Sequence, residues 1–249
     1  MRIAVAGKGG TGKTTFCALA VKALLRAGKA PILVVDADPN ANLGEALGIE
    51  AGDSVADIVA SADGQPYLPG GMTKERYLAY RIHQALAEGR DIDLLVMGGP
   101  EGAGCYCYVN NLLRGLIEEL HGNYPVMIVD NEAGLEHLSR RTTGKADFLF
   151  VLSDASGRGI LSARRIAGLV RRLRLDVGSM GLVIGRAPEG AAGALAGPIG
   201  KLDIPLWGIV PEDPEIAALD LAWRPLTGVG DNNAALSAVA DILRNQGII

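Results

Sequence analysis

The chain has 249 residues and a mass of 25.9 kDa, a size that fits one α/β domain with a full core. Its net charge of −4 argues against a basic surface for nucleic acid, and no apolar run reaches the roughly 18 residues of a transmembrane helix. Three cysteines are too few for a disulfide framework and suggest thiols or metal ligands. We therefore expect a cytoplasmic protein that binds neither nucleic acid nor membrane.

Apolar runs alternate with helical stretches from end to end, which predicts one domain over residues 1–249 with a doubly wound, mainly parallel sheet of about 7–8 strands. The expected strands are Arg2–Ala6, Pro31–Asp36, Asp93–Met97, Val126–Asp130, Phe148–Ser153, Gly181–Gly185 and Leu206–Val210. The expected helices are Thr14–Ala27, Thr73–Ala87, Asn110–Glu119, Gly134–Thr142, Gly159–Leu173 and Ala234–Arg244, with a helix–loop insertion over Ala51–Gly71. Ligands of such sheets bind beyond the carboxyl ends of the strands.

The segment from Gly7 to Thr15 matches the pattern G-x-x-x-x-G-K-[ST] of a phosphate-binding loop, placed between the first strand and the first helix. In such a loop backbone N–H groups surround phosphate oxygens, Lys13 neutralises the outer phosphates, and Thr14 offers its hydroxyl to Mg²⁺. Glycines permit the positive φ angles and the close backbone approach that this requires. The strand–loop–helix context disfavours a chance glycine-rich turn. The expected nucleotide ligands here are Gly9, Gly10, Thr11, Gly12, Lys13, Thr14 and Thr15.

Two carboxylates follow the second expected strand, in the sequence Asp36-Ala37-Asp38-Pro39-Asn40. Beside a triphosphate, Asp36 would hold magnesium and Asp38 would position the attacking water. The alternative is that these residues cap a helix over Ala41–Leu47, because Asp and Asn are favoured N-cap residues.

A third carboxylate, Asp130, ends the apolar strand that begins near Val126, as in the second motif of phosphate-loop enzymes. We expect Asp130 to reach the magnesium shell opposite Thr14. The following Asn131, Glu132 and Gly134 are predicted to form a switch that senses the γ-phosphate together with Asp38. Helix capping by Asp130 is the alternative interpretation.

Cys105 and Cys107 stand one residue apart in a glycine-rich segment ahead of an expected helix. A helix N-terminus lowers the pKa of a thiol, so both are candidate thiolates for a soft metal. Two thiolates are too few for a tetrahedral zinc site, but a two-fold dimer would supply four, which suits Zn²⁺ or Ni²⁺. The alternative is a pair of inert buried cysteines. Cys17 is expected in the core. His83, His121 and His137 are candidate additional ligands, but ordinary helical residues are the favoured interpretation.

Lys8, the Asp-x-Asp-Pro sequence and the segment 130–134 together resemble the deviant phosphate-loop ATPases, which include the nitrogenase iron protein and the Min and ParA proteins. The resemblance implies ATP hydrolysis to ADP and phosphate in a homodimer. In it Lys8 would reach the partner's phosphates and act in catalysis with Lys13 and Asp38. The alternative for Lys8 is a solvated loop lysine.

Base recognition departs from that family pattern. The family usually has an adenine-binding asparagine at the end of the strand that corresponds to 181–185, where this chain has Gly185 followed by Arg186. No Asn-Lys-x-Asp guanine signature occurs, so ATP is favoured over GTP. Arg186 and the residues Pro211 and Glu212, which resemble the family's base-packing loop, are the expected contacts.

Cys-x-Cys at 105–107, combined with the segment 130–141, looks like the nickel-maturation ATPases of carbon monoxide dehydrogenase and acetyl-CoA synthase, the CooC and AcsF types. This resemblance implies that ATP/ADP, Mg²⁺ and Ni²⁺ or Zn²⁺ bind to a homodimer that serves a nickel–iron–sulfur client enzyme. Two alternatives remain open: an electron-transfer protein like the nitrogenase iron protein, with a shared Fe–S cluster, and a ParA or MinD-type positioning ATPase.

Overall fold

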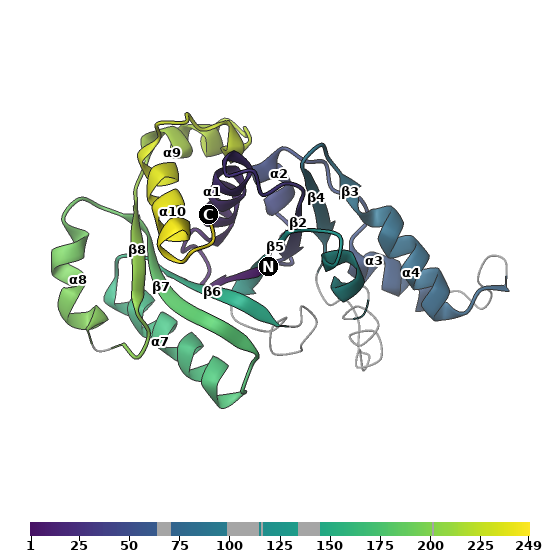
Figure 1. Cartoon of the computed structure of the whole chain (residues 1–249), viewed down its shortest axis with the longest axis horizontal. Helices are drawn as coiled ribbons and strands as arrows, with labels where there is room; N and C mark the ends of the chain where they lie inside the picture. The colour runs from purple at the N-terminus through teal and green to yellow at the C-terminus, as the bar shows by residue number, and fades with distance from the viewer. Residues whose placement is uncertain (64–70, 99–114, 116, 134–144, 201) are drawn as a thin grey trace.

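The computed structural model of the chain describes residues 1–63, 71–98, 115, 117–133, 145–200 and 202–249. Its centre is a sheet of eight strands in the order β3-β4-β2-β5-β1-β6-β7-β8 (Figure 1). Neighbouring strands are parallel except for β3 and β4. The strands are β1 (Arg2–Gly7), β2 (Ile32–Ala37), β3 (Ala87–Glu88), β4 (Ile92–Val96), β5 (Val126–Ala133), β6 (Ala146–Ser153), β7 (Val177–Ala187) and β8 (Leu206–Pro211).

Helices cover both faces of the sheet, which is why every residue of the apolar strands β1 and β2 is buried. One face packs against α1 (Lys13–Arg26), α2 (Leu43–Leu47), α9 (Pro214–Leu221), the 3₁₀ helix η2 (Leu226–Gly228) and α10 (Ala234–Asn245). The opposite face packs against α3 (Val55–Asp63), α4 (Lys74–Ala85), α7 (Gly157–Arg172) and α8 (Ala191–Ile199). The predicted doubly wound α/β fold is therefore confirmed.

All seven expected strands are present, and β7 is longer than its apolar centre predicted. The expected helices at 14–27, 73–87, 159–173 and 234–244 correspond to α1, α4, α7 and α10. Residues 115 and 117–119 of the expected helix 110–119 are helical, and the expected helix 134–142 lies outside the described residues. The sequence reading missed β3, α8 and α9. α8 contains only Ala, Gly, Leu, Pro and Ile, so it has no polar periodicity to reveal it.

The sheet brings the predicted carboxylates together at one edge. β2 and β5 are neighbours, and their register pairs Asp36 directly with Asp130. β1 lies on the other side of β5 and leads into the glycine-rich loop. No helix in the described part of the chain has the length and hydrophobicity needed to cross a membrane.

Candidate nucleotide-binding site

The first turn of α1 is open to an anion. Its N-cap residue, Gly12, has a left-handed backbone (φ 85°) and supplies no side-chain cap, and the turn contains no acidic residue. The N–H groups of a first helical turn have no intrahelical acceptor, so here they are available to a ligand. Gly10 also has a positive φ of 79°, as expected for a loop that turns its N–H groups inward.

Lys13 and Thr14 begin α1 and connect the loop to the sheet edge. Lys13 is buried, with 7% of its surface exposed, although lysines are rarely buried without an anionic partner. The Thr14 hydroxyl donates a 2.7 Å hydrogen bond to Oδ2 of Asp130, which joins the loop to the end of β5. The structure therefore brings together the two residues that the sequence assigned to opposite sides of a magnesium ion.

Asp130 is buried with one oxygen unpaired. Its Oδ1 atom is buried and has no hydrogen-bond partner among the described residues. Burial raises the pKa of Asp130 to about 7, Asp36 adds to that rise, and the Thr14 hydroxyl and Lys13 oppose it. A hard divalent cation would supply both a partner for Oδ1 and a compensating charge. The carboxylate and hydroxyl donor set therefore fits Mg²⁺.

Asp36 shapes the loop that carries Asp38. Its two carboxylate oxygens accept the backbone N–H groups of Asp38, at 3.1 Å, and of Leu43, at 2.9 Å. Burial raises the pKa of Asp36, and these two hydrogen bonds oppose the rise. Both oxygens thus already hold the loop, and a contact between Asp36 and magnesium stays a prediction.

Asp38 does not cap the helix that follows. α2 begins at Leu43, its N-cap Asn42 makes no side-chain cap, and the N–H of Leu43 is bound by Asp36. Oδ1 of Asp38 accepts the backbone N–H and the side-chain amide of Asn40, at 3.0 and 2.9 Å. This carboxylate lines the cleft described below, where the predicted catalytic role requires it.

The predicted switch residues divide into one buried and one facing the cleft. Asn131 is fully buried, and its amide donates to the carbonyl of Val5 at 2.9 Å, so it connects β5 to β1. Glu132 lines the cleft. Gly134, the third switch residue, lies outside the described residues.

Lys13, Thr14, Asp38 and Glu132 line one cleft of about 1230 Å³, whereas the buried Asp36, Asp130 and Asn131 do not line it. From the loop it is lined by Gly9, Gly10, Gly12, Lys13, Thr14 and Thr15, and from other segments by Asp38, Pro39, Asn40, Asn42, Glu45, Ala46, Gly48, Glu132, Ala133, Arg186, Asp220, Leu221, Trp223, Arg224, Pro225 and Leu226. Two predicted loop residues do not line it. Thr11 is buried and donates its hydroxyl to the carbonyl of Lys8, at 2.8 Å, whereas Lys8 is exposed.

The expected base contacts line two different hollows. Arg186 lines the cleft and donates from its guanidinium to the carbonyl of Gly10. Pro211 and Glu212 instead line a neighbouring hollow of about 840 Å³ beside the end of β7. Gly185 packs against the loop: a Cβ there would lie 2.8 Å from the carbonyl oxygen of Thr11. A side chain such as the family's asparagine would therefore collide with the loop in this conformation.

The expected metal ligands Cys105 and Cys107 lie outside the described residues, as does His137. Within the described ranges, no three His, Cys, Asp or Glu side chains are grouped so that they could hold a metal. Cys17 is buried in the core as expected, and its pKa is raised by burial and by the neighbouring Asp130. Gly98 is the last described residue before the two cysteines. It lies just after the carboxyl end of β4, on the same edge of the sheet as the phosphate loop.

Sequence reading missed the wall of the cleft that α9 and the residues after it provide, from Asp220 to Leu226. One signal was available. Trp223 is one of only two tryptophans in the chain, and it lies shortly before Pro225 in a segment for which the sequence predicted neither a helix nor a strand.

Comparison with known proteins places the chain in a family. Residues 3–225 match the model of the CobQ/CobB/MinD/ParA nucleotide binding domain. An ATP-binding protein of Methanocaldococcus jannaschii, itself uncharacterised, is 43% identical over 97% of this chain and 96% of its own length. The carbon monoxide dehydrogenase accessory protein CooC of Rhodospirillum rubrum is 32% identical over 70% of each chain.

Solved structures agree on the fold. The MinD cell division protein of Aquifex aeolicus matches with a TM-score of 0.72 and 22% identity, covering 99% of this chain and 96% of that one. MinD of Pyrococcus horikoshii, complexed with Mg-ADP, matches with a TM-score of 0.70 and 20% identity, covering 98% and 95%. The chain belongs to the CobQ/CobB/MinD/ParA nucleotide-binding family.

Proposed function

We propose that this chain is a dimeric ATPase that hydrolyses ATP to ADP and phosphate, with residues 1–249 as one domain. The observation that carries the proposal is the floor of the cleft. There the uncapped first turn of α1, the buried Lys13 and the Thr14–Asp130 hydrogen bond converge at the carboxyl edge of the sheet. A triphosphate would satisfy the first two, and Mg²⁺ the third.

Different residues of the site would bind the phosphates, hold Mg²⁺ and orient the attacking water. The N–H groups of the loop and the ammonium of Lys13 hold the phosphates, which gain negative charge on their outer oxygens during transfer. Thr14 and Asp130 would hold Mg²⁺, which supplies charge neutralisation between the phosphates. Asp38 and Glu132 both line the cleft. In the proposed reaction Asp38 orients the attacking water, and Glu132 belongs to the switch that senses the γ-phosphate.

Adenine recognition is assigned to the side of the loop near β7. Arg186 lies over the loop, with its Cγ 3.9 Å from the position of a Cβ on Gly12, and its guanidinium offers a flat surface for stacking. Pro211 and Glu212 would contact the base from the neighbouring hollow. Gly185 contributes close packing against the loop, so we assign the role of the family's asparagine to these three residues.

Lys8 supports the homodimeric part of the proposal. It is exposed and, unlike its neighbours Gly9 and Gly10, does not line the cleft of its own chain. In the proposed dimer, a lysine that does not line its own cleft would serve the phosphates of the second copy. Supplying positive charge in trans, as an arginine finger does, would make hydrolysis depend on dimerisation.

We further propose that the dimer is a metallochaperone. Cys105 and Cys107 from each chain would hold one Ni²⁺ or Zn²⁺ between the subunits, and ATP hydrolysis would drive nickel insertion into a carbon monoxide dehydrogenase or acetyl-CoA synthase cluster. Two points support this: the likeness to CooC, and the position of Gly98, the last described residue before Cys105, on the same sheet edge as the phosphate loop. Nucleotide and metal would be coupled if each binds two dimer states unequally.

The test is anaerobic sizing with metal analysis, with and without Mg²⁺-ATP, on wild type and on the Cys105→Ala/Cys107→Ala double variant. We expect one Ni²⁺ or Zn²⁺ per wild-type dimer and none in the double variant, with ATP hydrolysis retained in both. Equal metal content in the two proteins would reject the metallochaperone. Absence of ATP hydrolysis in wild type would reject the ATPase.

A positioning ATPase is the second candidate, and one observation favours it. Six exposed arginines lie on α7 and just beyond it, while residues 155–175 contain no Asp or Glu. They are Arg158, Arg164, Arg165, Arg171, Arg172 and Arg174. The whole-chain charge of −4 concealed this basic stripe, which an anionic polymer or membrane surface would match. Salt-sensitive binding of duplex DNA or anionic vesicles, lost in Arg165→Ala/Arg172→Ala, would support this candidate over the metallochaperone.

A further inference from the structure

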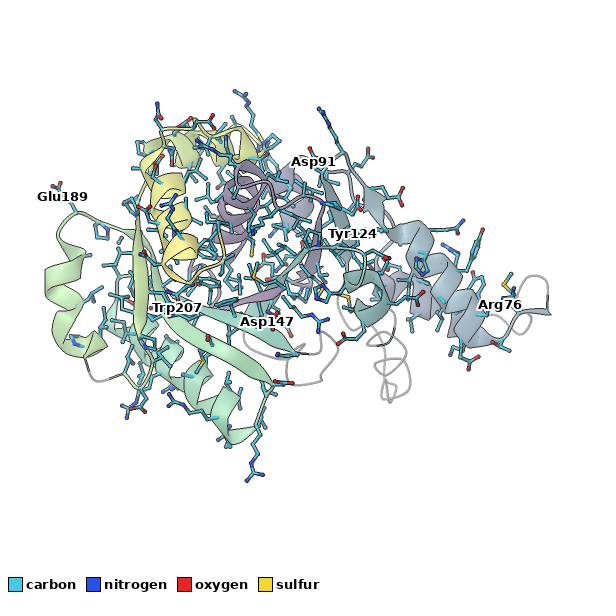
Figure 2. The ribbon with its side chains drawn as sticks, viewed as in Figure 1. Arg76, Asp91, Tyr124, Asp147, Glu189 and Trp207 are labelled. Atoms are coloured by element: carbon cyan, nitrogen blue, oxygen red, sulfur yellow. The ribbon has the colours of Figure 1, made fainter. Side chains whose placement is uncertain are left out.

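The outer face of α7 is basic over its whole length. Arg158, Arg165 and Arg172 recur every seven residues, which places them on one side of the helix, and all three are exposed. At about 1.5 Å per residue they extend over roughly 20 Å. Nitrogen-tipped side chains project from this helix away from the sheet (Figure 2). These three arginines form the centre of the basic stripe.

Most arginines of the stripe have no carboxylate beside them, unlike exposed arginines elsewhere in the chain. Arg26, for example, pairs with Asp231 at 3.4 Å. On the stripe, Arg171 is the one arginine with an ion-pair partner in the described part of the chain, Asp203 at 3.4 Å. The charge of the other five guanidinium groups is therefore directed to solvent and available to an anionic partner.

The stripe also contains an exposed leucine and a gap. Leu161 has 45% of its surface exposed and lies on the same face as Arg158 and Arg165. A Cβ at Gly168 would meet no atom within 4 Å, so packing inside the chain does not require a glycine there. A glycine inside a helix nevertheless costs about 1 kcal/mol relative to alanine. Gly168 thus leaves room between Arg165 and Arg172 for another molecule to reach the helix backbone.

These features favour one kind of anionic partner. The large apolar residues on the inner face of α7, among them Ile160 and Ile166, are buried against the sheet, so they are not available to insert into a lipid surface. Phosphates of a nucleic acid offer Leu161 no apolar contact, and the net charge of −4 repels a long polyanion. The surface of an acidic protein supplies both carboxylates for the arginines and an apolar side chain for the leucine.

We propose that the basic stripe docks a partner protein whose surface carries carboxylates around an apolar side chain, with that side chain packed between Leu161 and Gly168. This inference goes beyond the proposed ATPase and does not depend on it. α7 follows β6, in which Leu152 is paired with Gly7, so the stripe begins at the sheet edge that carries the phosphate loop. A docked partner therefore has one end beside the nucleotide site, where a client of the proposed metallochaperone would be needed.

Two peptides of equal length and charge test the proposal by fluorescence anisotropy. The first consists of Glu and Leu, and in the second Ser replaces every Leu. Wild type should bind the Glu–Leu peptide about fivefold more tightly than the Glu–Ser peptide, because only the first can cover Leu161. Duplex DNA and phosphatidylglycerol vesicles, at the same salt concentration, should bind more weakly than the Glu–Leu peptide.

Paired variants test the charges. Arg165→Ala/Arg172→Ala should weaken binding of the Glu–Leu peptide by about 10-fold or more. The matched control Arg76→Ala/Arg90→Ala removes the same charge from exposed positions, and Arg76 lies at the opposite end of the molecule from α7 (Figure 2). This control should change binding by less than about twofold.

Single variants test the leucine and the gap. Leu161→Ala should remove the preference for the Glu–Leu over the Glu–Ser peptide. Gly168→Gln fills the gap and should weaken binding of the Glu–Leu peptide severalfold. The melting temperature of Gly168→Gln should not fall, because glutamine is a better helix former than glycine and its side chain has open space. A variant that merely damaged the helix would lose both binding and stability.

The outcomes separate this inference from the proposed function. Failure of wild type to bind the Glu–Leu peptide, or equal binding by Arg165→Ala/Arg172→Ala, would overturn it. Tighter binding of DNA or vesicles than of the peptide, lost in the same double variant, would overturn it in favour of the positioning ATPase. ATP hydrolysis and metal content report on the proposed function, and their absence in wild type would leave the docking surface standing if the peptide binds as expected.

Discussion

The floor and the rim of the cleft are built in opposite ways. At the floor and next to it, Lys13, Asp36 and Asp130 are charged residues yet buried. Hydrogen bonds from Thr14 to Asp130 and from Leu43 to Asp36 join the neighbouring segments to the sheet. On the rim, Lys8 is charged and exposed, and Trp223 is apolar and exposed. The difference teaches that the groups suited to a phosphate and to Mg²⁺ are buried within one chain, whereas Lys8 and Trp223 make their side chains available to solvent or to a partner.

The largest expected effect is on the rate of ATP hydrolysis when Lys8 is replaced. Lys8→Ala should leave ATP affinity within about threefold of wild type but reduce the hydrolysis rate by roughly 10³-fold, because a cation supplied in trans acts on the transition state. Calorimetric titration of ATP and steady-state phosphate release would measure the two effects. A Lys8→Ala variant that loses affinity and rate equally would show instead that Lys8 serves its own chain's phosphates.

Replacing Lys13, the buried lysine at the floor of the cleft, should instead reduce nucleotide affinity. Lys13→Ala deletes the buried charge that we assign to phosphate binding, and we expect ATP and ADP affinity to fall by about 100-fold or more. The cysteine pair should still bind Ni²⁺. Lys29→Ala, at a lysine beyond the end of α1, is the matched control and should bind nucleotide normally. If Lys13→Ala kept the ATP and ADP affinity of wild type, the proposal that the floor of the cleft binds phosphate would be contradicted.

The buried carboxylate of Asp130 predicts a pH dependence of stability in the absence of nucleotide and metal. Its pKa is raised to about 7 in the folded chain and is near 3.8 when unfolded, so between these values the folded state binds more protons. The free energy of unfolding should therefore fall as pH rises from about 4 to 7. Asp130→Asn removes this ionisation and should gain about 2–4 kcal/mol over wild type at pH 8, and little at pH 4.

Urea unfolding at pH 4 and pH 8 in EDTA would measure this difference. Adding Mg²⁺ at pH 8 should stabilise wild type and leave Asp130→Asn nearly unchanged, because only the carboxylate offers the cation a charge. Equal stability of the two proteins at pH 8 would mean that the carboxylate is solvated well enough to ionise at no cost.

The floor was predictable from sequence because local patterns encode it. The glycine-rich loop, Lys13 and Thr14 stand consecutively, and the apolar strands that lead to Asp36 and Asp130 have their carboxyl ends at the same edge once the sheet is parallel. The rim was not predictable, because Leu221 and Trp223 reach the cleft through a fold-back of the chain some 200 residues after the loop. The hydrogen bonds of Asp36 and the close packing of Gly185 also depend on distant backbone, which no local pattern encodes.

The smallest expected effect tests whether the floor is as tightly built as its hydrogen bonds imply. In Gly185→Ala the new Cβ would lie 2.8 Å from the carbonyl oxygen of Thr11, a backbone atom that can move only with the phosphate loop. We expect a loss of about 1–3 kcal/mol in the free energy of unfolding and a severalfold loss of ATP affinity. Gly168→Ala is the matched control: its Cβ would meet no atom within 4 Å on the exposed face of α7, so it should stabilise by about 0.5–1 kcal/mol. If Gly185→Ala were as stable as that control and bound ATP normally, the loop would be free to shift, and the contrast between a rigid floor and an incomplete rim would not hold.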